Sequence, residues 1–228
     1  MTQAPPEDHK GRALYRAEQV RELDRRVIAS GVAGFALMQR AAASAWRYLR
    51  ETWPEVRHLS VLCGGGNNGG DGHVLAALAA AEGLSVQRIL LKPVEALKGD
   101  ARRAAEMADA AGVGRQPWQE GMVLTGELVV DAVLGTGLSG EVCGASRSAI
   151  AAINACGKPV LAIDIPSGLH ADTGAELGEA VHASRTVTFI GDKLGLHTGR
   201  GPARTGGVAV FDLAAPRAAF DGMTPAAW

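Results

Sequence analysis

Between Leu14 and Arg50 the apolar residues recur every three or four positions, on one stripe before Gly31 and on a second stripe after Gly34. This period predicts two amphipathic helices, and the two glycines predict the break between them. The stripes comprise Val20, Leu23, Val27 and Ile28, followed by Phe35, Met38, Ala42, Trp46 and Leu49. We therefore expect the chain to begin with a helical pair.

After Pro54 the pattern changes, because short apolar runs now alternate with helical stretches. Strands are predicted at 59–62, 86–91, 128–134, 159–164, 185–190 and 207–211, and helices at 72–81, 100–111 and 146–156. Alternation of this kind predicts parallel strands joined by right-handed crossovers, with helices on both faces. The expected fold class is α/β, a three-layer αβα Rossmann-like sandwich with a mostly parallel sheet behind the N-terminal helical pair. Residues 199–207, rich in glycine, are expected to form a mobile loop.

Composition narrows the class of protein. The 228 residues include 23 basic and 24 acidic side chains, so no charge excess favours nucleic acid or an anionic membrane as a partner. Three cysteines, Cys63, Cys143 and Cys156, lack disulfide or zinc spacing, and no apolar run reaches the roughly 18 residues of a membrane span. We expect a cytoplasmic protein with a disordered tail at residues 1–12 and one domain at residues 13–228.

The segment from Gly64 to Gly72 joins a predicted strand to a predicted helix through a run of glycines and asparagines. Such a joint lets the backbone approach a ligand closely, and it contains the dinucleotide pattern Gly-x-Gly-x-x-Gly. An ordinary NAD dehydrogenase is disfavoured because the next strand ends at Lys92 and not at an acid. Asp71 would oppose a phosphate unless a cation or a hydrogen bond offsets its charge. The alternative is a tight turn that serves packing alone.

Polar residues also follow the later strands. Asp131 and Asp164 each end an apolar run, where desolvation could adapt one of them to acid and base chemistry. Oxygen atoms of Asn68, Asp131 and Ser167 would suit a hard cation such as potassium, sodium or magnesium. Lys193 could reach a phosphate or Asp164. The simpler alternatives are acids that cap loops and a solvated lysine.

Four segments together resemble the NAD(P)H-hydrate epimerases, also called the apolipoprotein A-I-binding protein family. They are Gly-Gly-Gly-Asn-Asn-Gly-Gly-Asp-Gly at 64–72, Asp-Ala-Val-Leu-Gly-Thr-Gly at 131–137, Asp-Ile-Pro-Ser-Gly-Leu at 164–169, and Thr-Phe-Ile-Gly-Asp-Lys-Leu-Gly-Leu at 188–196. The resemblance covers about residues 14–213. It implies an isomerase that interconverts the R and S forms of NADH or NADPH hydrated at C6 of the nicotinamide ring, as a step of metabolite repair.

The resemblance also implies roles for particular residues. Asp164 and Lys193 would be catalytic, and one potassium ion per subunit would be held by Asn68, Asp131 and Ser167. The substrate, the hydrate of NADH (NADHX) or of NADPH (NADPHX), would be bound by Asn67, Asn68, Gly69, Gly70, Asp71, Gly135, Thr136, Gly137, Leu138, Ser139, Gly140, Glu141 and Asp164. Which of the two hydrates is preferred is left open, because Arg88 and Lys92 could each approach a 2′-phosphate or be solvated.

Partners follow from the same resemblance. A separate ADP- or ATP-dependent dehydratase is expected, since no dehydratase domain is recognised in this chain, and a homodimer is common in the family. Gln39 and Ala42 stand where relatives usually have glutamate and glycine, which leaves the dimer contact open. Two other functions remain: a non-catalytic, nucleotide-dependent binding module of the same fold, and an enzyme acting on a sugar or phosphosugar.

Overall fold

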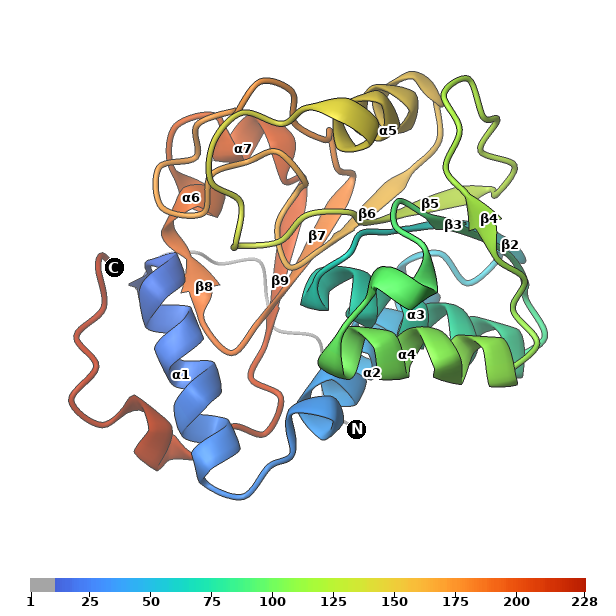
Figure 1. The fold of residues 1–228 in the computed structure, drawn as a ribbon. Helices are drawn as coiled ribbons and strands as arrows, with labels where there is room; N and C mark the ends of the chain where they lie inside the picture. Colours follow the sequence, from blue (N-terminus) through green and yellow to red (C-terminus); the bar gives the residue numbers. More distant parts are fainter. Residues whose placement is uncertain (1–10) are drawn as a thin grey trace.

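The computed structural model describes residues 11–228, so the predicted tail at residues 1–12 lies almost wholly outside the described residues. Its centre is a seven-stranded sheet in the order β4-β3-β2-β5-β6-β7-β9, and every neighbouring pair is parallel (Figure 1). The strands are β2 (His58–Cys63), β3 (Ser85–Leu90), β4 (Gln116–Pro117), β5 (Leu128–Ala132), β6 (Val160–Ile163), β7 (Arg185–Phe189) and β9 (Gly207–Phe211). The predicted parallel sheet is confirmed.

Helices cover both faces of this sheet. On one face lie α2 (Gly34–Thr52), α3 (Asn67–Ala81) and α4 (Gly99–Ala110), and on the other lies α5 (Gly144–Ala155) (Figure 1). Alternate residues of each strand serve the two cores, as Val61 packs with the first group and Leu62 with α5. The fold is therefore the predicted three-layer αβα sandwich.

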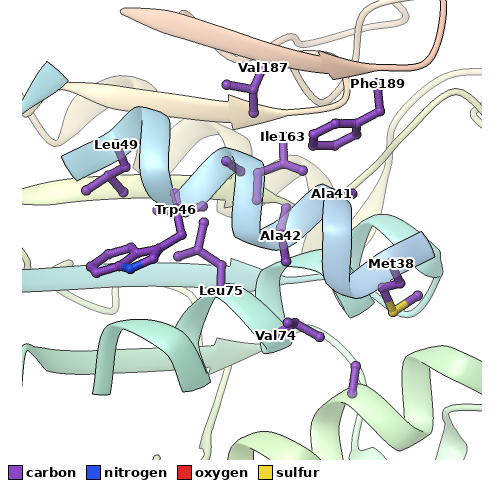
Figure 2. Close-up of a cluster of buried hydrophobic side chains, with 14 of the residues drawn as sticks. Met38, Ala41, Ala42, Trp46, Leu49, Val74, Leu75, Ile163, Val187 and Phe189 are labelled. Carbon is purple, nitrogen blue, oxygen red and sulfur yellow. The ribbon is translucent and has the colours of Figure 1, made fainter. Parts of the chain in front are cut away.

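The face covered by α2 holds the larger core. Figure 2 shows Met38, Ala42, Trp46 and Leu49 of α2 lying over Val74 and Leu75 of α3, with Ile163, Val187 and Phe189 of the sheet nearby. Leu49 and Ala42 are completely buried. Ala42 is thus part of the interior, whereas Gln39 is exposed.

The predicted helical pair consists of α1 (Ala17–Ala29) and α2, which meet at 118°. Within residues 11–228 no single helix is long and apolar enough to cross a membrane; only the bent pair, taken together, meets that length and composition. The N-terminus of α1 is fixed by Asp172, whose carboxylate accepts a 2.6 Å hydrogen bond from the Ala17 amide. This bond ties α1 to the loop that follows β6.

A second, two-stranded sheet brings together segments that are far apart in the described sequence. In it β1 (Leu14–Tyr15) pairs in parallel with β8 (Asp192–Lys193), and Leu14 also forms a bridge with Ala227. Strands this short have no periodicity to read, and neither β1 nor β8 was predicted. The segment at 199–207, predicted as a mobile loop, contains the short helix α7 (Gly201–Arg204) after α6 (Leu194–His197). Two short 3₁₀ helices, η1 (Val94–Ala96) and η2 (Arg217–Phe220), complete the regular elements of the described residues.

One helix boundary was predicted wrongly. The sequence pattern placed the start of the helix after β2 at Gly72, but α3 begins at Asn67. Glycine disfavours helices because of its backbone entropy, which explains the prediction. Here close packing outweighs that cost: a Cβ atom at Gly69 would lie 2.1 Å from the Gly64 carbonyl oxygen, and one at Gly72 would lie 2.6 Å from the Ala132 Cβ.

Candidate functional site

A cleft of about 900 Å³ opens at the carboxyl ends of β2, β3, β5 and β6. The chain leaves β2 toward β3 on one side and later places β5 on the other side, so the cleft lies where the strand order reverses. Open α/β sheets bind their ligands at this kind of position. A second hollow of about 610 Å³ lies beside Trp118 and Arg147 and contains none of the predicted site residues. The larger cleft is the candidate site.

The glycine segment brings two strand ends into direct contact. Gly64 donates a 2.9 Å hydrogen bond to the Ala132 carbonyl, and a Cβ atom on Gly64 would lie only 1.9 Å from the Val133 carbonyl oxygen. Gly66 is the N-cap of α3, so the first N–H groups of this helix lie beside the cleft. Such a helix start favours an anionic group, as in dinucleotide-binding folds.

Asp164 is held in an unusual conformation at the end of β6. Its φ angle is 71°, in the left-handed region that non-glycine residues rarely adopt and that often marks functional sites. One carboxylate oxygen lies 2.8 Å from the Lys193 ammonium, and the other accepts a bond of 3.2 Å from the Thr136 amide. Lys193 is completely buried and also donates to the Thr188 hydroxyl at 2.6 Å. The pair that was predicted to be catalytic is thus in contact.

The three predicted potassium ligands converge around the backbone of Leu134. The Ser167 hydroxyl donates to an Asp131 carboxylate oxygen at 2.6 Å and accepts from the Leu134 amide at 2.8 Å. The side-chain amide nitrogen (Nδ2) of Asn68 donates to the Leu134 carbonyl at 2.9 Å. Burial raises the pKa of Asp131 to about 6, and hydrogen bonds from Ser167 and Val133 oppose that rise.

One atom in this group has no hydrogen-bond partner. Within the described part of the chain, the buried side-chain oxygen Oδ1 of Asn68 is unpaired, which is costly for a buried polar atom unless a ligand satisfies it. The side-chain atoms of Asn68, Asp131 and Ser167 that could bind a metal ion are all oxygens. Residues 11–228 hold no cluster of three or more His, Cys, Asp or Glu side chains that could bind a metal. The donor set fits a hard alkali cation and not a transition metal.

Carboxylates gather near the lysine. Burial raises the pKa of Asp24 to about 6, with the Lys193 ammonium opposing the rise and the Asp164 carboxylate adding to it. Burial, helped by the charges of Asp164 and Asp24, also raises the pKa of Asp71 well above its usual value. The three acids therefore share one electrostatic environment around a single ammonium group. Groups with such perturbed pKa values in a cleft are candidates for proton transfer.

Asp24 was not predicted from the sequence. It lies in α1, one turn after Arg21, whose guanidinium donates to the Thr136 carbonyl at 3.4 Å and so ties α1 to the loop above Asp164. The available signal was the position of an acid directly beside the buried stripe of Val20 and Leu23. A charge at the edge of an apolar stripe needs a partner or a function.

Most of the predicted substrate-binding residues line the cleft, and a few do not. Those that line it are Asn67, Asn68, Asp71, Gly135, Thr136, Gly137, Leu138, Ser139 and Asp164. Gly69 and Gly70 are buried inside the first turns of α3, where their missing side chains permit packing. Gly140 and Glu141 lie outside the lining, and the Glu141 side chain packs against Gly178.

The two basic residues considered for a 2′-phosphate have different environments. Arg88 is completely buried, forms an ion pair with Asp109 and donates to the carbonyls of Ala105, within α4, and Val113, which follows α4. It is therefore not available to a ligand. Lys92 is exposed and lines the cleft.

Comparisons of this chain with family models and with known proteins agree on one family. The family model described as YjeF-related protein N-terminus matches residues 34–195. The bifunctional NAD(P)H-hydrate repair enzyme Nnr of Coxiella burnetii is 46% identical over 200 residues, which cover 88% of this chain and 41% of that protein. The corresponding Escherichia coli enzyme is 40% identical, over 77% of this chain and 34% of its own length. The chain thus spans about two fifths or less of these bifunctional relatives.

A shorter relative matches over most of its length. The NAD(P)H-hydrate epimerase of Limosilactobacillus fermentum is 34% identical, covering 86% of this chain and 94% of that protein. Among solved structures, the crystal structure of yeast ynu0 superposes with a TM-score of 0.76 at 19% identity, covering 94% of this chain and 96% of the yeast chain. That likeness supports the fold.

Proposed function

The chain belongs to the NAD(P)H-hydrate epimerase family, whose domain is described as the YjeF-related protein N-terminus, and on that premise we propose that it epimerises C6-hydrated NADH and NADPH. The observation that carries this proposal is the contact between Asp164 and the buried Lys193 at the floor of a cleft large enough for a dinucleotide. Two relatives named as epimerases are covered over 94% and 85% of their own length.

The reaction requires the hydroxyl at C6 to leave and water to return to the other face of the ring. We assign the first proton transfer to Asp164: the C6–O bond breaks as the hydroxyl leaves as water, and the ring nitrogen supplies the electron pair of an iminium. Lys193 stabilises the carboxylate that remains after the transfer, because its ammonium group forms an ion pair with Asp164 at 2.8 Å.

A second carboxyl is needed when water adds to the iminium and loses a proton. Asp24 belongs to the α1 wall of the same cleft and is electrostatically coupled to Asp164, so we assign it this role. The two epimers differ only at C6. The group that donates a proton in one direction therefore accepts one in the other, and exchange with solvent restores both carboxyls.

We also propose one potassium ion per subunit, held by Asn68, Asp131 and Ser167. The unpaired Asn68 oxygen and the all-oxygen donor set support this assignment. When bound, the ion would supply a fixed positive charge beneath an acidic cleft. The residues of this chain contribute the orientation of the loop at 133–139, through the bonds of Ser167 and Asn68 to Leu134.

We also propose a functional partner for this protein. An ADP- or ATP-dependent dehydratase would consume the S epimer, and the bifunctional relatives named as repair enzymes support a link between the two activities. A homodimer and a cytoplasmic location stay predictions from the sequence.

The test is the interconversion of R and S hydrates, followed by chiral separation with and without potassium chloride. We expect the wild-type protein to equilibrate the epimers and Asp164→Asn to reduce turnover by at least about a hundredfold, the usual range for a lost acid–base group. The control is Asp221→Asn, which removes an exposed carboxyl outside the cleft. Near-wild-type turnover by Asp164→Asn would remove Asp164 from the mechanism. A protein that only gains thermal stability with the hydrates would be a binding module.

A further inference from the structure

The cleft is longer than the reacting ring requires. It extends from Asp164, beyond β6, past the glycine segment after β2, to Lys92 beyond β3. If the nicotinamide reacts at Asp164, as proposed above, the other half of the dinucleotide must lie toward β3. The inference below therefore rests on the proposed function.

The order of the strands specifies what meets each part of the substrate. In dinucleotide-binding sheets the loop after the first strand holds the pyrophosphate, and the residue at the end of the second strand meets the 2′ position of the adenosine ribose. Here β2, α3 and β3 form the equivalent unit, with Gly66 at the N-terminus of α3. β3 ends at Leu90, and Lys92 follows two residues later. An acid at this position would accept bonds from a free 2′-hydroxyl, but a lysine cannot.

The surroundings of Lys92 place it over the cleft. Its aliphatic stem crosses the glycine segment, because a Cβ atom on Gly65 would lie 2.5 Å from the Lys92 Cδ. Among residues 11–228 no carboxylate lies within ion-pair distance of its ammonium group, although Asp100 also lines the cleft. The other nearby cation, Arg88, is already paired with Asp109. The Lys92 ammonium group therefore remains available at the end of the cleft beyond β3, where the adenosine ribose would lie.

We propose that Lys92 binds the 2′-phosphate of the adenosine ribose, and that this contact makes the site favour hydrated NADPH over hydrated NADH. The ammonium group supplies a charge-assisted bond that only the phosphorylated substrate can use.

The experiment compares kcat/KM for the two hydrates in wild type, Lys92→Ala and Lys92→Glu. The matched control is Lys98→Ala, an exposed lysine that precedes α4 and does not line the cleft. Loss of one charge-assisted bond predicts that Lys92→Ala raises KM for hydrated NADPH about tenfold, with kcat and both constants for hydrated NADH unchanged. Lys92→Glu should discriminate further against the phosphorylated substrate, because it adds repulsion.

Equal effects on both hydrates, or no effect on either, would overturn the assignment. Failure of the proposed function gives a different result, since the wild-type protein would then epimerise neither hydrate. In that case calorimetric titration with NADP⁺ and NAD⁺ still decides the role of Lys92: preference for NADP⁺ that is lost in Lys92→Ala supports it, and equal binding by both proteins refutes it.

Discussion

Replacing Gly64 by alanine tests whether the glycine segment is required by packing as well as by the ligand. The added methyl would lie 1.9 Å from the Val133 carbonyl oxygen, whereas real Cβ atoms essentially never lie within 3.0 Å of another group. Relief requires the ends of β2 and β5 to separate by more than about 1 Å, yet these strands are bonded together through the Gly64 amide. Because the obstacle is backbone, we expect the upper part of the overpacking range, about 3 kcal/mol of unfolding free energy.

The assay is equilibrium unfolding in urea together with thermal denaturation. For a chain of this length about 3 kcal/mol corresponds to a fall in Tm of roughly 6–12 °C. Gly66→Ala is the matched control, because nothing lies within 4 Å of a Cβ atom there and its φ of −108° suits alanine. It should cost less than about 1 kcal/mol, the usual effect of alanine at an N-cap. If the two variants unfolded at the same urea concentration, the steric argument would be wrong.

Three further results are expected. The folded-state pKa of Asp24 is raised to about 6, so its charged form destabilises the protein at pH 8. Asp24→Asn should therefore stabilise the protein at pH 8 by on the order of 1–2 kcal/mol while reducing turnover, and this gain in stability should vanish below about pH 4. An unchanged Tm at pH 8 would contradict this. The pKa of Asp109 is lowered to about 2, by Arg115 first and then by Arg88, so Asp109→Asn should cost on the order of 1–2 kcal/mol at pH 7. The cost should shrink as the pH falls from about 4 through 2, and an equal loss in the urea midpoint at pH 7 and pH 2 would contradict this. Potassium chloride should raise Tm relative to choline chloride at equal ionic strength in wild type but not in Asn68→Ala, and equal responses of the two proteins would exclude Asn68 as a ligand.

Elements with a strong local pattern could be predicted from the sequence. The six longer strands and the helices α1, α2, α4 and α5 were predicted within a few residues, since apolar period and turn residues act locally, whereas the four-residue helices α6 and α7 were not predicted. The start of α3 could not be predicted, because the glycines at 69 and 72 are selected by contacts with Gly64 and Ala132 and not by helix propensity. The pairing of β1 with β8 joins residues almost 180 positions apart and leaves no local signal.

The site was predictable to the extent that its residues lie in motifs at strand ends. Parallel strands bring those ends to one edge, which is why Asn68, Asp131, Asp164 and Ser167 meet. A motif does not distinguish a residue that faces the ligand from one that allows packing, and the assignment of Gly69 to the substrate stays a prediction. The orientation of single side chains likewise depends on tertiary contacts.

The pairing of β1 with β8 has a practical consequence. Leu14 lies beside Asp192 and also bridges to Ala227, so the N-terminal side of the described polypeptide pairs directly with the strand that carries Lys193, and the C-terminal side is attached to it through Leu14. Anything that pulls on either extremity, such as a purification tag or a neighbouring module in a fused gene product, exerts its force next to the ammonium group. Removal of tags should therefore precede any kinetic comparison.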